Sequence, residues 1–103
     1  MSDLPKEALT LQDLRARRDE ILKLAQQYGA YNVRVFGSVA RGEATPDSDV
    51  DLLVNFREGT SLFELSGFWQ DLQELLGRDV NLLSENGLKE RFRKRIEGDI
   101  VPL

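Results

Sequence analysis

Apolar side chains recur at helical spacing in three segments of the chain. The first segment begins at Thr10 and Asp13, which approximate a capping box, and it ends at Gly29. Its apolar positions predict one amphipathic helix of roughly five turns. The second segment, residues 62–76, carries a wide apolar stripe that includes Phe63, Phe68 and Trp69. Because helical spacing already accounts for these aromatic residues, we expect them in the core rather than on a base-stacking surface.

The third helical segment is the basic tail GLKERFRKRI. Leu88, Phe92 and Ile96 lie four residues apart in it, which predicts a helix with one apolar face. The surrounding cations are Lys89, Arg91, Arg93, Lys94 and Arg95. They form either an ordinary solvated face or a surface for an anion or a partner.

Three short apolar runs predict strands at residues 32–36, 50–56 and 78–83. The run VDLLVNF is apolar on both faces after Asp51, which favours a strand inside the sheet over an edge strand. The order helix, strand, loop, strand, helix, strand, helix predicts a small α/β fold in which a sheet packs against helices.

Length and composition limit the possible functions. A chain of 103 residues with 41% hydrophobic content suits one domain, expected at residues 10–103 after a tail of residues 1–9. The formal net charge of -4 argues against general nucleic-acid binding. The sequence shows no signal peptide and no membrane-spanning stretch, so the expected location is the cytoplasm.

The chain has no Cys and no His, which leaves only oxygen atoms as strong metal ligands. Oxygen ligands favour hard cations, so any bound metal is expected to be Mg²⁺, Mn²⁺ or Ca²⁺. Thiolate and histidine catalysis are both excluded.

Carboxylates alternate in the run GSVARGEATPDSDVD, at Asp47, Asp49 and Asp51. A calcium-binding EF-hand is unsuitable, because Leu52 stands where that loop needs Gly for a sharp turn. A Walker-type phosphate loop is unsuitable too, because Glu43 stands where that motif needs Lys. A structural Asp turn explains Asp47 and Ser48 but leaves the carboxylate at 51 in an apolar run.

A bound divalent cation would explain why the Asp51 carboxylate is tolerated in an apolar run. Residues two apart on a strand share a face, so Asp49 and Asp51 could converge on Mg²⁺ and leave positions open for phosphate oxygens. Gly37 would let the backbone approach a phosphate, Ser38 offers a hydroxyl and an amide at the start of a short helix, and Arg41 could add a charged fork.

These residues resemble a known signature. Gly37-Ser38, ten intervening residues and Asp49-Val50-Asp51 are similar to the motif of the polymerase-beta-like nucleotidyltransferase superfamily. The GSVARGE opening and the chain length resemble the minimal nucleotidyltransferases (the MNT group), to which the MntA-type antitoxins belong. The likeness extends over nearly the whole chain from about Thr10, which implies the small nucleotidyltransferase fold with a mixed sheet.

The resemblance also implies a function. Members of this group are typically encoded beside a HEPN-domain toxin and neutralise it, in some cases by transferring AMP from ATP to a toxin tyrosine. By resemblance, Asp49 and Asp51 would be the catalytic, Mg²⁺-binding residues, while Gly37 and Ser38 would hold the phosphates of ATP. The implied partners are therefore the toxin and a nucleoside triphosphate.

One position departs from the family pattern. Related enzymes carry a third carboxylate on the next strand, and the matching residue here is Asn81, which cannot accept a proton at neutral pH. Asp79, two residues earlier, could substitute, or it could be an exposed strand-end residue. Two alternatives to the transferase therefore stay open: a catalytically weak or inactive antitoxin that acts by binding, and transfer of a nucleotide to a small molecule.

Overall fold

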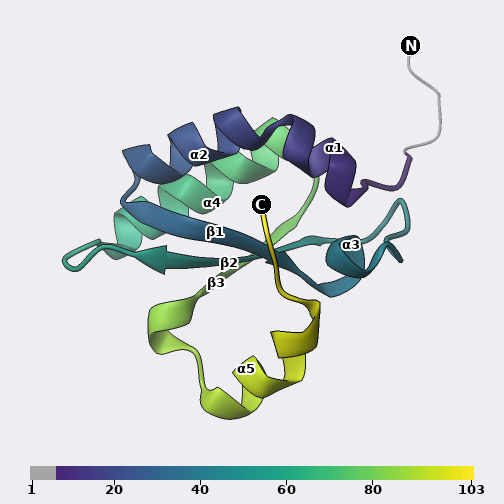
Figure 1. The fold of residues 1–103 in the computed structure, drawn as a ribbon. Coiled ribbons are helices and arrows are strands. Elements are labelled where there is room, and N and C mark those ends of the chain that lie inside the picture. The colour runs from purple at the N-terminus through teal and green to yellow at the C-terminus, as the bar shows by residue number, and fades with distance from the viewer. Residues whose placement is uncertain (1–6) are drawn as a thin grey trace.

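The computed structural model describes residues 7–103 and forms a layered α/β fold (Figure 1). The helices at residues 11–16, 18–27 and 62–76 cover one face of the sheet. The helix at residues 90–96, with 3-10 turns at residues 85–87 and 97–99, covers the other face. The predicted α/β class is confirmed. Of the predicted tail at residues 1–9, residues 1–6 lie outside the described residues. The helices are α1 (Leu11–Ala16), α2 (Arg18–Gln27), α3 (Gly37–Arg41), α4 (Leu62–Leu76) and α5 (Glu90–Ile96).

The first predicted helix is two helices, α1 and α2, which separate at Arg17. The capping box at Thr10 is present, with Asp13 as its partner. The predicted single helix is wrong because Arg17 leaves the helical conformation, at φ -106 and ψ 17, while its guanidinium donates to the backbone oxygen of Leu75 at 2.5 Å. This contact joins residues 58 positions apart, so local spacing does not reveal it.

The sheet has four strands in the order β3-β2-β1-β4. Their bounds are β1 (Ala30–Phe36), β2 (Val50–Phe56), β3 (Val80–Ser84) and β4 (Val101–Pro102). Strand β2 is internal, as predicted, and pairs antiparallel with β1 and parallel with β3. The two-residue strand β4 was not predicted, and its Pro102 is tolerated because β4 lies at the sheet edge.

Side chains of β2 alternate between two apolar clusters. Val50, Leu52 and Val54 belong to the large core beneath α1, α2 and α4. Leu53 belongs to a smaller cluster with Phe36 and Ile96 beneath α5. Because residues two apart share a face, Asp51 points to the α5 side of the sheet.

The aromatic residues of α4 do not all lie in the core. Phe68 is fully buried, as expected, but Phe63 is 90% exposed and its neighbour Leu62 is 83% exposed. Trp69 is 37% exposed and its indole N–H donates to the backbone oxygen of Val80 at 2.7 Å. The expectation of burial fails at Phe63 because α4 extends past the edge of the apolar core at its first turn.

Among residues 7–103, no helix has the length and apolar character needed to cross a membrane.

Candidate active site

Asp51 lies at the meeting point of three segments. On β2 it pairs with Phe36 of the antiparallel strand β1 and with Asn81 of the parallel strand β3. Its carboxylate rests against Gly37, since a Cβ added to that glycine would stand 2.1 Å from Asp51 Oδ2. Gly37 also has φ +74, a conformation that strains other residues. Both facts make glycine necessary at the start of α3.

Asp49 lies just before β2 and is exposed, whereas Asp51 is half-buried. Burial raises the pKa of the Asp51 carboxyl, and the charge of Asp49 raises this pKa further. A hydrogen bond with the Asn81 side chain and the charge of Arg41 act in the opposite direction on the same pKa. The ionised form of Asp51 is therefore disfavoured by its surroundings, and a cation between the two carboxylates would stabilise it.

Helix α3 begins directly after β1 and carries Ser38 in its first turn, as the sequence predicted. Ser38 is half-buried, and its backbone oxygen accepts from the N–H of Glu43 at 2.9 Å. No side-chain hydrogen bond found among residues 7–103 uses the Ser38 hydroxyl. This hydroxyl is free to donate to an anion placed beside Gly37.

Arg41, at the end of α3, already has two carboxylate partners. Its Nε lies 2.9 Å from Glu43 Oε1, and its Nη1 lies 2.7 Å from Asp99 Oδ2. These two hydrogen bonds raise the pKa of Arg41. The guanidinium lies close enough to Asp51 to affect its pKa, and carboxylates already occupy two of its five N–H donors.

The two candidates for a third ligand take different positions. Asn81 is exposed on β3 beside Asp51. Asp79 is exposed before β3, and its backbone oxygen accepts from the N–H of Val50 at 2.9 Å. Within residues 7–103, no three or more Asp, Glu, His or Cys side chains gather as a metal site would require. The site therefore offers two carboxylates and one amide.

This donor set fits magnesium bound together with a substrate. Mg²⁺ is commonly held by one or two carboxylates and completes its coordination with water and substrate phosphate oxygens. Asp49 and Asp51 would supply the carboxylates, and a bound cation would offset the burial that raises the pKa of Asp51. Gly37 leaves room for the Asp51 carboxylate at the same point.

Sequence reasoning missed two residues of this site, Glu43 and Asp99. In the sequence, Glu43 only rules out a Walker-type loop, whereas in the structure it binds Arg41, two residues earlier. Asp99 gave no local signal, because 58 residues separate it from Arg41 along the chain. Only the approach of the 3-10 turn Glu97–Asp99 to α3 brings the pair together.

A mixed sheet whose internal strand carries one aspartate and is preceded by another, beside a Gly-Ser turn into a short helix, is an arrangement that fits a nucleotide-transferring enzyme. Sequence comparison agrees: the profile of the nucleotidyltransferase domain matches residues 18–101, and the chain belongs to this family. The resemblance inferred from the motif is thus confirmed.

Individual relatives extend the comparison. The chain is 39% identical over 79 residues to the protein adenylyltransferase MntA of Thermococcus cleftensis, covering 77% of this chain and 80% of that protein. A solved structure assigned as a minimal nucleotidyltransferase matches with a TM-score of 0.81 and 48% identity, covering 92% of this chain and 97% of the other. A tri-AMPylated Shewanella oneidensis HEPN toxin in complex with MNT antitoxin contains a chain of the same fold, with a TM-score of 0.65, 17% identity, and coverage of 85% and 69%.

Proposed function

We propose that this nucleotidyltransferase is a Mg²⁺-dependent protein adenylyltransferase. It transfers AMP from ATP to the tyrosine hydroxyl of a HEPN-domain toxin and so acts as an antitoxin. The observation that carries the proposal is the half-buried Asp51, with its raised pKa, held against Gly37 and close to Asp49. The relative named protein adenylyltransferase MntA, and the complex of an AMPylated HEPN toxin with MNT antitoxin, support the choice of acceptor.

The chemistry follows from the positions of these groups. The acceptor oxygen forms a bond to the α-phosphorus of ATP, the bond from that phosphorus to the bridging oxygen breaks, and pyrophosphate leaves. Asp49 and Asp51 would hold Mg²⁺, which when bound offsets the negative charge of the phosphates. The Ser38 hydroxyl would donate to a phosphate oxygen next to Gly37. The acceptor proton passes to a carboxylate or to water, because the Asn81 amide cannot take it.

A second function is favoured by one specific observation. Asn81 stands beside Asp51, and no third carboxylate joins the pair among residues 7–103. A site of this kind could bind nucleotide yet transfer AMP slowly, and the chain would then neutralise its partner by binding it.

Supplying ATP labelled at its α-phosphate, together with Mg²⁺ and the HEPN-domain toxin proposed as the partner, separates the two functions. The proposed enzyme labels the partner, and both Asp49→Asn and Asp51→Asn abolish the labelling. Asp47→Asn is the matched control, because Asp47 is an exposed carboxylate in the same loop. Protection from the toxin that survives Asp51→Asn would support the binding function, and label on a small molecule alone would contradict the protein acceptor.

A further inference from the structure

The charge of this chain is unevenly distributed along its length. Residues 89–96, which include helix α5, carry five cations and one carboxylate, a local charge of +4. Since the whole chain has a net charge of -4, the remaining residues together carry -8. A segregation of this size orients charged partners during their approach.

Of the cations around α5, one forms an ion pair that holds the helix to the rest of the fold, and the others do not. Arg93 pairs with Glu85 of the 3-10 turn Glu85–Gly87. Lys94 reaches Glu90 at 3.8 Å in an exposed pair, which contributes little. Within residues 7–103, no carboxylate lies within ion-pairing distance of the remaining three cations. These are Lys89, Arg91 and Arg95, and all of them are exposed.

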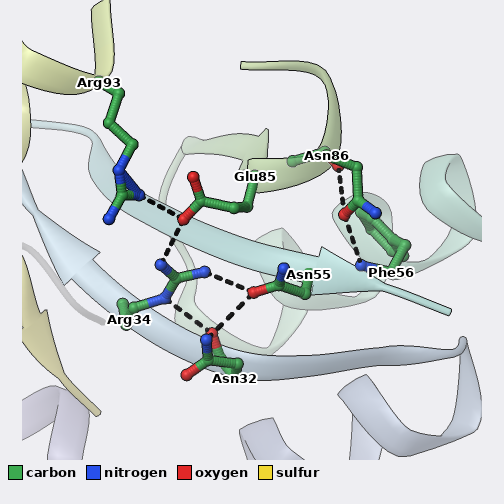
Figure 2. Close-up of polar contacts among 8 residues, drawn as sticks. Asn32, Arg34, Asn55, Phe56, Glu85, Asn86 and Arg93 are labelled. Carbon is green, nitrogen blue, oxygen red and sulfur yellow. Dashed lines mark hydrogen bonds and ion pairs between the residues drawn. The ribbon is translucent and has the colours of Figure 1, made fainter. Parts of the chain in front are cut away.

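Helix α5 is fixed to the sheet rather than loosely attached. Glu85 lies between two guanidinium groups, those of Arg93 and of the largely buried Arg34 (Figure 2). The Nη1 atom of Arg34 lies 2.6 Å from Glu85 Oε1. Arg34 also donates to Asn55 on β2 at 2.7 Å. Beneath this network Ile96 is buried in the small apolar cluster. The backbone of α5 is thus preorganised, and binding has to order only the exposed side chains on its outer face.

The same helix lies beside the candidate active site. Ile96 packs in one cluster with Leu53, which follows Asp51 by two residues on the same face of β2, roughly 7 Å along the strand. The turn after α5 carries Asp99, which binds Arg41 of α3. A macromolecule bound to α5 would therefore lie on the same side of the sheet as the one to which Asp51 points.

We propose that the outer face of α5, defined by Lys89, Arg91, Lys94 and Arg95, docks an acidic surface of the protein acceptor and presents its hydroxyl to the active site. This inference rests on the proposed transfer to a protein. The basic face attracts an acidic patch, and the charge of -8 elsewhere repels that patch from other orientations. A long nucleic acid fits less well, because it would extend beyond the basic face onto acidic surface.

The test compares two charge reversals of equal size. Arg91→Glu/Arg95→Glu changes the outer face of α5. Arg18→Glu/Arg57→Glu changes two other exposed arginines, at the start of α2 and after β2. Titration calorimetry measures the affinity of each variant of the chain for the proposed HEPN-domain partner, at about 0.05 M and about 0.5 M salt. Thermal unfolding checks that each variant is folded. If the charge reversal on α5 prevents folding, the neutral variant Arg91→Gln/Arg95→Gln replaces it in the affinity measurement.

We expect the α5 reversal to weaken binding at low salt by about tenfold or more and the control to change it by less than about twofold. At high salt, most of the difference in affinity between the two variants should disappear. Equal affinities for the two variants would overturn the proposal. RNA that copurifies with the unmodified chain and is lost from the α5 variant, with toxin binding unchanged, would overturn it as well. Binding that depends on α5 without any AMP transfer would refute the proposed reaction and leave the docking surface standing.

Discussion

Replacing Gly37 with alanine tests the geometry of the site most locally. Two costs arise. At φ +74 an alanine adopts a left-handed conformation, which costs about 1–2 kcal/mol. Its Cβ would also stand 2.1 Å from Asp51 Oδ2 and 3.0 Å from Asp51 Cγ, so the carboxylate must move. Overpacking of this kind costs about 1–3 kcal/mol. The free energy of unfolding should therefore fall by about 2–5 kcal/mol.

Gly77→Ala is the matched control for this substitution. Gly77 has φ +64 at the end of α4, and an added Cβ there would meet nothing within 4 Å. The control should show only the backbone cost, about 1–2 kcal/mol. Urea denaturation measures both unfolding free energies, and a titration of Mg²⁺-ATP measures binding. Gly37→Ala should lose nucleotide binding while Gly77→Ala keeps it. Equal stability losses in the two variants, with equal nucleotide binding, would refute the reasoning.

Three further predictions concern ionised groups. The folded-state pKa of Asp51 is raised, so the stability of the metal-free protein should fall as pH rises through that pKa, and Asp51→Asn should remove this part of the pH dependence of unfolding. Asp99→Asn should raise the affinity for Mg²⁺-ATP several-fold by releasing Arg41, and should have no such effect in an Arg41→Ala background; calorimetry of the four proteins checks this. Glu85→Gln should lower the unfolding free energy by about 1–3 kcal/mol, because it weakens the partner of the largely buried Arg34. The pKa of Glu85 is lowered, so its contribution should be present at neutral pH and disappear as pH falls through that pKa, as denaturation at several pH values would show.

Much of the fold could be predicted from local patterns. The bounds of β2 and α4 match their predicted residue ranges, because an apolar run and a wide apolar stripe between turn residues are strong signals. Strand β4 has two residues, too few for any periodic signal. The break between α1 and α2 depends on a contact from Arg17 to α4, which no local rule contains.

For the candidate site, the sequence names its residues but not their electrostatic surroundings. The sequence assigns Gly37 to a phosphate and Asp51 to a metal, which stay predictions, and the structure brings these two residues into contact. The pairing of Arg41 with two carboxylates could not be predicted, because one of these partners, Asp99, comes from the far end of the chain. The exposure of Phe63 was missed for a similar reason: helical spacing indicates a shared face but not where the core ends.

We propose that Asp49 and Asp51 together hold a divalent cation that carries a nucleoside triphosphate, and calorimetry can test this. ATP is titrated into the purified chain, with and without the proposed HEPN-domain partner, first with Mg²⁺ present and again with the metal chelated. We expect saturable binding that requires Mg²⁺, disappears in Asp49→Asn/Asp51→Asn and persists in Asp47→Asn. Binding of equal strength without the metal, or in the double variant, would show that the two aspartates hold no such cation.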